Sequence, residues 1–457
     1  MPSDDERAAL LRDGAERAIR YLGGLDERPV GVASEAIARL ALLDEALPDS
    51  PRVAAEVLAQ LDTIGSAATS ATAGGRFFGY VIGGSVPAAL AANWLAAAWD
   101  QDAGMASVCP INARLEEIAL GWLCELLRLP AGCGGAFVTG ATMANFGALA
   151  AARHAVLARA GWDVEADGLF GAPCVSLLLG EEAHVSVVKA LSLLGFGRKS
   201  IVRLPVDGQG RTKATGLPAI TGPAIVCLQA GNVNTGACDP APELIDWARE
   251  AGAWVHCDGA FGLWAAAAPA HAHLVEGFGE ADSWAVDAHK WLNVPYDSGI
   301  ALVRDTASLQ AAMAAGAAPY LASSGWREPD QFTPEMSRRA RGVDIWAALS
   351  SLGRSGVSDL IERSCRHAAR MADALAAAGY EVLNEVVLNQ VLVSFGSPDE
   401  TRRVIVALQE DGTCWCGGTV WQGRTAMRIS VSSWATKDAD IERSIGAMLR
   451  IAGMARA

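Results

Sequence analysis

Lys290 is the residue whose setting points most directly to chemistry. It follows His289 where an apolar stretch, Ser283-Trp-Ala-Val-Asp287, runs out. A lysine at the end of a buried strand can be desolvated enough to lose its proton, and a neutral amine forms a Schiff base with an aldehyde cofactor. A lysine at a strand end is more often a solvated surface residue, so this interpretation requires further groups nearby.

Asp258 is the first of these groups. It ends another apolar stretch, Trp254-Val-His-Cys-Asp258, upstream of the lysine. Ligands of parallel α/β sheets bind at the carboxyl ends of the strands, so Asp258 and Lys290 can face one crevice. An aspartate there can pair with a protonated pyridine nitrogen, which keeps a pyridine cofactor cationic and able to accept electrons. Taken alone, Asp258 could equally be a turn or helix N-cap residue.

A glycine-rich segment, residues 132–147, offers a place for a phosphate. It passes through a short apolar strand into an alanine-rich helix predicted over residues 143–160. Helix N-termini present free N–H groups and a positive dipole end, so we place a cofactor phosphate on Gly140, Ala141 and Thr142. Tight packing is the alternative reason for such glycines. The segment lacks the dinucleotide and P-loop patterns, which argues against dinucleotides and nucleoside triphosphates.

His184 follows Gly180-Glu-Glu-Ala, at the start of another predicted helix. An imidazole can lie flat over a pyridine ring and can also donate a proton near the reacting carbon. A lone histidine here would be an ordinary helix-start residue. The order of the four features, each at the end of a predicted strand, favours a site for pyridoxal 5′-phosphate (PLP).

With these residues the chain resembles the group II PLP-dependent amino acid decarboxylases, which include the aromatic-L-amino-acid, tyrosine and glutamate decarboxylases. The resemblance covers nearly the whole chain. Arg76-Phe-Phe-Gly-Tyr80 is similar to the family's segment at the substrate entrance, and Pro110-Ile-Asn-Ala-Arg-Leu-Glu116 is similar to its Pro-x-x-x-x-Leu-Glu segment. The resemblance implies the type I fold of aspartate aminotransferase and a homodimer with the active site at the interface.

The resemblance also implies a role for each site residue. Lys290 corresponds to the Schiff-base lysine, Asp258 to the partner of the ring nitrogen, and His184 to the ring-stacking histidine. The phosphate contacts are implied for His289, Ala141 and Thr142, and Ala260 packs under the ring. Phe78, Tyr80 and Phe332 are implied to contact the substrate.

One position departs from the family pattern. A tyrosine on a mobile loop protonates the carbon left by CO2 in well-studied members, and Phe332 stands about where that tyrosine would be. Phenylalanine has no proton to give. In some members such a loss diverts the reaction to oxygen and yields an aldehyde, in which case Phe332→Tyr would shift products toward the amine. Otherwise another acid serves, with Tyr80, Tyr320 and His184 as candidates.

Composition agrees with a globular enzyme. The 457 residues exceed one ordinary core, and 51% hydrophobic with 19% charged residues is unlike a disordered chain. A formal charge of −14 argues against a nucleic-acid partner. The ten cysteines lack paired metal spacing, which predicts no metal site and reduced thiols. Without an apolar signal core or an apolar run of 18 residues, we expect a soluble, cytoplasmic protein with no membrane partner.

The chain is expected to form an α/β fold of the PLP-dependent transferase type I class. Residues 1–75 show helical periodicity and, by the resemblance, would clasp a partner subunit. Alternating strands and helices over 76–315 predict a large PLP-binding domain with a mostly parallel, seven-stranded-type sheet. Residues 316–342 are a predicted connecting loop, and 343–457 a small α+β domain with helices over 343–353, 356–378 and 437–452.

The resulting prediction is an enzyme that decarboxylates an L-amino acid to the amine and CO2. Aromatic or bulky apolar substrates are favoured because Phe77, Phe78, Trp94 and Trp99 lie near the pocket-lining segment of the family. The alternatives are decarboxylation with oxidative deamination to an aldehyde, another carbon–carbon lyase on the same fold, and a non-catalytic scaffold. A missing lysine or aspartate would favour the scaffold, and both are present.

Overall fold

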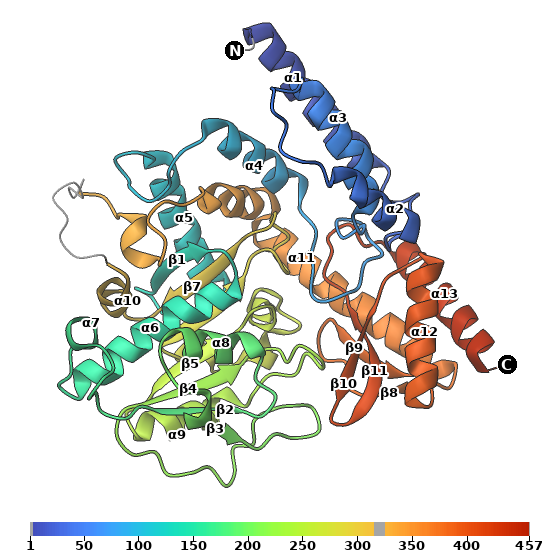
Figure 1. The fold of residues 1–457 in the computed structure, drawn as a ribbon. Coiled ribbons are helices and arrows are strands. Elements are labelled where there is room, and N and C mark those ends of the chain that lie inside the picture. Colours follow the sequence, from blue (N-terminus) through green and yellow to red (C-terminus); the bar gives the residue numbers. More distant parts are fainter. Residues whose placement is uncertain (1–2, 315–324, 457) are drawn as a thin grey trace. The chain divides into compact units, whose positions relative to one another are not determined.

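The computed structural model describes residues 3–314 and 325–456. The chain divides into two compact units (Figure 1). The larger unit contains residues 83–369 and 384–391, and the smaller unit contains the remaining N-terminal and C-terminal segments. The predicted connecting loop over 316–342 lies partly outside the described residues.

A seven-stranded sheet forms the centre of the larger unit. Its strand order is β1-β7-β6-β5-β4-β2-β3, with β7 antiparallel to both of its neighbours and the pairs among β2 to β6 parallel. This confirms the predicted mostly parallel α/β sheet. The strands are β1 Gly134–Val138, β2 Ser176–Gly180, β3 Ile201–Leu204, β4 Ala224–Gln229, β5 Trp254–Asp258, β6 Ser283–Asp287 and β7 Gly299–Val303.

The strands are continuous apolar runs because helices cover them. Every residue of β4, β5, β6 and β7 is buried. The helices of this unit are α4 Pro87–Trp99, α5 Pro110–Leu126, α6 Ala141–Arg159, α7 Val164–Asp167, α8 Val185–Leu193, α9 Ala241–Glu250, α10 Thr306–Met313 and the first part of α11 Arg341–Ala377.

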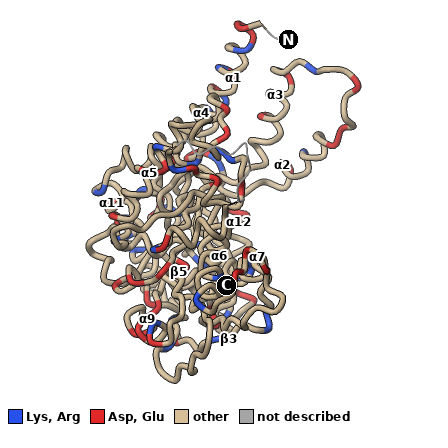
Figure 2. Tube along the Cα trace, turned by 90° about the vertical axis from the view of Figure 1, so that its left-hand side faces the viewer, with Lys and Arg blue, Asp and Glu red and all other residues tan. Residues whose placement is uncertain are grey.

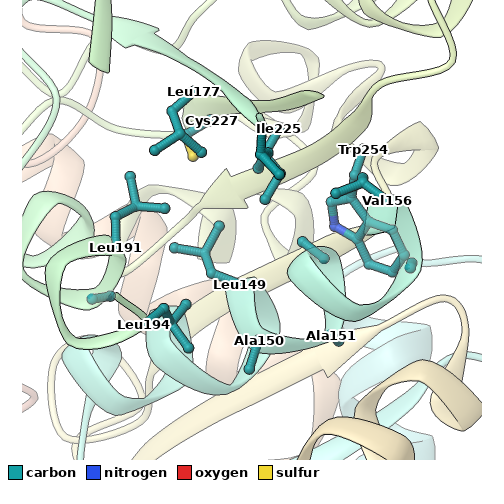
Figure 3. Close-up of a cluster of buried hydrophobic side chains, with 14 of the residues drawn as sticks. Leu149, Ala150, Ala151, Val156, Leu177, Leu191, Leu194, Ile225, Cys227 and Trp254 are labelled. Atoms are coloured by element: carbon teal, nitrogen blue, oxygen red, sulfur yellow. The ribbon is translucent and has the colours of Figure 1, made fainter. Parts of the chain in front are cut away.

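Small side chains let α6 lie close to the sheet. The helix packs on β5, β6 and β7 and against α8 and α10. Figure 3 shows Leu149 pointing from α6 into the apolar core that also contains Ile225 and Trp254. At its N-terminus the chain approaches β7 so closely that a Cβ on Gly299 would lie 2.4 Å from the backbone of Gly140. This approach fixes the turn at which the sequence analysis placed a phosphate.

A buried ion cluster attaches the segment that leads into α11. Glu116 of α5 is fully buried and pairs with Arg338 at 3.0 Å and with Arg327 at 3.5 Å. The Asn112 side chain donates to the same carboxylate at 3.0 Å. Removing Glu116 would leave two largely buried arginines without their carboxylate, so the cluster holds residues 327–338 against α5.

The smaller unit contains a four-stranded sheet of order β10-β11-β9-β8, in which β10 pairs with β11 and β8 pairs with β9 in antiparallel register. Its elements are α1 Asp4–Gly23, α2 Ser34–Arg39, α3 Ala54–Gly65, β8 Glu381–Val382, β9 Gln390–Ser394, α12 Pro398–Asp411, β10 Gly417–Trp421, β11 Arg424–Ser430 and α13 Asp438–Arg456. The last turns of α11 belong to this unit, and β9 begins in the larger one.

Helix α11 contains the break that the sequence predicted. Gly353, the last residue of the first predicted helix, has a φ of 61°, in the left-handed region that glycine adopts without a steric penalty. The two helical stretches therefore change direction at this residue.

Acidic and basic residues are interspersed along the chain, as the trace in Figure 2 shows. Among the described residues, no helix combines the length and the apolar character that a membrane span requires.

Candidate functional site

The candidate site lies where parallel strands of the larger unit end. Strands β4 and β5 place Gln229 beside Asp258, and β6 ends nearby at Asp287. A pocket at this edge is lined by His184, Asp258 and Gln229, together with Gly180, Thr212 and Asp239. The structure therefore brings together His184 and Asp258, which are 74 residues apart by their numbers in the sequence.

Asp258 carries a buried oxygen that lacks a partner. Its Oδ1 accepts a 3.3 Å hydrogen bond from the Ala260 backbone, whereas its Oδ2 has no hydrogen-bond partner among the described residues. Burial raises the pKa of the Asp258 carboxyl, and the nearby His184 and Lys290 oppose this rise. An unpaired buried carboxylate oxygen is costly, so the position suits a ligand that delivers a cationic N–H, as a pyridinium ring does.

Lys290 lies against a carboxylate that the sequence analysis gave no role. Its Nζ is 2.9 Å from Oδ2 of Asp287. The other oxygen of Asp287 accepts a 2.6 Å hydrogen bond from the backbone N–H of Ala141 and lies 3.4 Å from Nε2 of His289. Asp287 therefore links the lysine, the histidine and the N-terminus of α6.

The turn before α6 has the features of a phosphate cradle. A Cβ on Gly140 would lie 3.0 Å from Cε1 of His289, so a larger residue there would press on the histidine ring. Ala141 begins the helix and Thr142 follows it, which places their N–H groups at the positive end of the helix dipole. His289 Nδ1 accepts from the Ser298 backbone at 3.0 Å, which directs Nε2 toward this turn, and burial lowers the pKa of His289.

His184 is held by the first turn of α8. It is the N-cap residue, and its Nδ1 lies 2.7 Å from Oγ of Ser186 and 3.3 Å from the Ser186 backbone nitrogen. Because a backbone N–H can only donate, Nδ1 is an acceptor in this contact. The ring proton of a neutral His184 is then on Nε2.

Phe78 and Tyr80, two of the predicted substrate contacts, differ in their exposure to solvent. Phe78 is fully buried in the smaller unit, whereas Tyr80 is 62% exposed and stacks on Trp415 with ring centroids 5.8 Å apart. Gly79 permits this stack, because a Cβ there would overlap the Trp415 ring. Tyr320 lies outside the described residues.

Phe332 is not among the residues that line this pocket. Its ring is partly buried against the apolar core that includes residues of α6 and α10, and the Arg327 guanidinium lies over it at 4.1 Å from the ring centroid. A different tyrosine, Tyr296, stacks on His289 with centroids 4.3 Å apart and is 59% exposed. The sequence analysis missed both Asp287 and Tyr296, although each lies within a few residues of Lys290.

Comparisons with known proteins agree with this geometry. Residues 37–396 match the model of the pyridoxal-dependent decarboxylase conserved domain. L-2,4-diaminobutyrate decarboxylase of Rhizobium meliloti is 30% identical over 377 residues, which cover 76% of this chain and 71% of that protein.

Two solved structures share the fold. The Oryza sativa enzyme TDC, crystallised with PLP and tryptamine, superposes with a TM-score of 0.90 at 21% identity, covering 99% of this chain and 98% of that one. Rhodiola rosea 4-hydroxyphenylacetaldehyde synthase gives a TM-score of 0.87 at 21% identity, covering 99% of both chains. The family match extends over most of the chain and includes every residue of the pocket, and it shows that the protein is a member of the pyridoxal-dependent decarboxylases, enzymes that use PLP to remove a carboxyl group from amino acids.

Proposed function

We propose that the protein decarboxylates an L-amino acid with an aromatic or bulky apolar side chain to the amine and CO2, and that Lys290 binds the cofactor covalently. The observation that carries the proposal is the pairing of a partnerless buried oxygen on Asp258 with His184 in one pocket at the strand ends. The aromatic preference rests on the resemblance, which places Phe77, Phe78, Trp94 and Trp99 near the family's pocket-lining segment. Diaminobutyrate, the substrate named for one relative, is the competing class.

PLP, when bound, supplies an electron sink for the bond that breaks at the substrate α-carbon. Asp258 would hold a proton on the ring nitrogen, since its Oδ2 accepts a cationic N–H in a buried setting. Ala141, Thr142 and His289 would bind the phosphate through N–H groups. His184 would cover the ring and present its Nε2 proton to the reacting side. Burial of these groups excludes water from the proton-holding carboxylate.

Rival functions can be distinguished by measuring the products that the protein releases from a panel of amino acids. A carbon–carbon lyase would cleave a different bond of the same substrate class, and a non-catalytic scaffold would release nothing. Lys290 and Asp258 are both retained, which argues against the scaffold. We also place the enzyme in the cytoplasm as part of the proposal, because all ten cysteines are unpaired and thiols persist in a reducing compartment.

The first prediction concerns Lys290. The purified protein should be yellow, and borohydride should fix PLP on Lys290 as seen by peptide mass spectrometry. Lys290→Ala should abolish both the adduct and CO2 release from a panel of amino acids. The matched control is Lys189→Ala, an exposed lysine on α8, which should change neither. An adduct that persists on another lysine in the Lys290→Ala variant would contradict the assignment.

The second prediction concerns Asp287, whose carboxylate accepts a hydrogen bond from the N–H of Ala141 and forms an ion pair with Lys290. A cofactor phosphate at the α6 N-terminus would meet this like charge. Asp287→Asn should therefore tighten PLP binding about tenfold or more in spectroscopic titrations of the apoprotein.

Pyridoxal, which lacks the phosphate, separates the two contacts of Asp287. Its affinity should rise less than that of PLP in Asp287→Asn, because only the release of Lys290 contributes. The control Asp305→Asn removes a carboxylate that caps α10 and should leave both affinities unchanged. Equal or weaker PLP binding by Asp287→Asn would refute the charge argument.

The third prediction concerns the product. We expect the amine as the main product in air-saturated buffer, and we expect Phe332→Tyr to leave the product ratio unchanged because Phe332 packs in the apolar core. Tyr296→Phe should slow protonation, on the order of 10²-fold by the usual worth of an acid catalyst. Oxygen would then compete, and aldehyde, ammonia and hydrogen peroxide would accompany CO2. If Phe332→Tyr instead converts an aldehyde product to amine, the missing loop tyrosine decides the outcome.

The fourth prediction concerns assembly. We propose that the working unit is a homodimer, because α1 has no buried residue within the chain and exposes Leu11 and Ile19, while α4 exposes Leu95 and Trp99. Burial of such surfaces against a second copy is favourable. Light scattering at the assay concentration should give twice the mass of one chain. A fully active monomer would overturn the proposal.

A further inference from the structure

A continuous chain of hydrogen bonds runs through the core of the larger unit to His184. Nε1 of Trp254 lies 2.9 Å from Oγ of Ser283, which lies 2.9 Å from Nδ1 of His256. Nε2 of His256 lies 2.7 Å from Oδ1 of Asn145, and Nδ2 of Asn145 lies 3.3 Å from Oγ of Ser186. The last bond joins Oγ of Ser186 to Nδ1 of His184. We call these residues the relay.

The relay is buried and crosses four elements of secondary structure. Ser283, His256 and Asn145 are completely buried, and Trp254 and Ser186 nearly so. They belong to β6, β5, α6 and α8. Ser186 is the member that hydrogen-bonds His184, through the bonds described above. The relay therefore connects the centre of the sheet to a residue that lines the pocket.

The amide of Asn145 sets the direction of the protons in the relay. Its Oδ1 can only accept, so Nε2 of His256 carries the ring proton and donates to it, and the Asn145 amide N–H donates to Ser186. Nδ1 of the neutral His256 ring therefore accepts from the Ser283 hydroxyl, which in turn accepts from the indole of Trp254. The Ser186 hydroxyl is left to donate to Nδ1 of His184.

The opposite direction fails at two points. It would require Nδ1 of His184 to donate, whereas the Ser186 backbone N–H also points at that atom and can only donate. It would also require Oδ1 of Asn145 to donate to Nε2 of His256, which an amide oxygen cannot do. His256 does not disturb the order by taking up a proton, because burial lowers the pKa of His256 to about 3.

From this geometry we propose that Asn145, His256 and Ser283 are positioning residues that hold His184 as the neutral tautomer with its proton on Nε2 and fix the plane of its ring. The inference rests on the proposed role of His184 over the cofactor ring. A neutral imidazole with its proton on Nε2 always presents a hydrogen-bond donor on the reacting side without carrying a charge. The relay supplies this state from the core, with no charged group in it.

A purely structural role would look different. Buried polar groups need partners in any protein, and losing one destabilises the fold without a specific effect on a distant histidine. The relay predicts instead that a change at Asn145 or Ser283 alters the tautomer and orientation of His184 while the cofactor remains bound. The relevant measurements are the ring-nitrogen NMR shifts of His184, the visible circular dichroism of bound PLP, and the separate values of kcat and KM.

The first experiment needs no change in the relay. The holoprotein labelled with ¹⁵N-histidine contains seven histidines, and the signals of His184 are identified by their loss in His184→Gln. We expect the shift pattern of a neutral ring protonated on Nε2 at neutral pH. A ring protonated on Nδ1, or on both nitrogens, would overturn the proposal. This readout does not require the substrate to be known, so it is independent of whether the proposed reaction is correct.

The second experiment interrupts the relay. Asn145→Leu has nearly the same shape and removes the central donor and acceptor, and Ser283→Ala removes the hydroxyl between Trp254 and His256. Each should keep PLP bound on Lys290, change the circular dichroism band of the cofactor, and lower kcat about tenfold or more with KM within about twofold. Ser283→Thr restores the hydroxyl and should recover most of the loss.

The matched control is Ser364→Ala. This serine is also buried, and its hydroxyl donates only to the carbonyl of Leu360 in its own helix. It should leave kcat, KM and the circular dichroism band unchanged. If Ser283→Ala behaves like Ser364→Ala, or if Ser283→Thr fails to rescue a folded, PLP-bound protein, the relay does not position His184.

Discussion

The structure depends on one constraint, which is that a carboxylate oxygen without a partner must be kept buried at the end of β5. Leaving Oδ2 of Asp258 unpaired costs on the order of 1–3 kcal/mol or more. The apolar strands on both sides of β5, covered by α6, keep water away and make the site selective for a cationic N–H. A solvated aspartate at the same position would hold the proton of a pyridinium far less strongly, because water screens the interaction.

Near that oxygen, the backbone holds the negatively charged Asp287 close to Lys290 and to the N-terminus of α6. Asp287 offsets Lys290 and the positive end of α6, and the glycines at positions 140 and 299 allow the turn, the histidine ring and β7 to approach one another. The same arrangement that suits a phosphate in this turn also places a carboxylate beside it. In the proposed site, the cofactor phosphate would replace the Asp287 carboxylate at the N–H of Ala141. The negative charge of Asp287 would therefore weaken cofactor binding.

Much of the fold follows from local patterns in the chain. The apolar stretches 254–258 and 283–287 predicted β5 and β6, because a strand buried on both faces is a continuous apolar run. The break in α11 was predicted as well, since the two periodic stretches were separated just after Gly353. Helix α12 was not predicted, and its capping box, Ser397 with Glu400, was the signal that could have revealed it.

The sequence by itself determined the fold class, the family and the residue types at the pocket, because these are properties of strand ends and of short motifs. It did not determine which groups touch. Asp287 was read as the last residue of a strand, and only the return of β7 under the α6 turn brought its carboxylate to Ala141. The hydrogen bonds from Trp254 through His256 and Asn145 to His184 join residues far apart in the chain. Their direction was decided by tertiary packing, because donors and acceptors take their roles only when buried partners leave them no alternative.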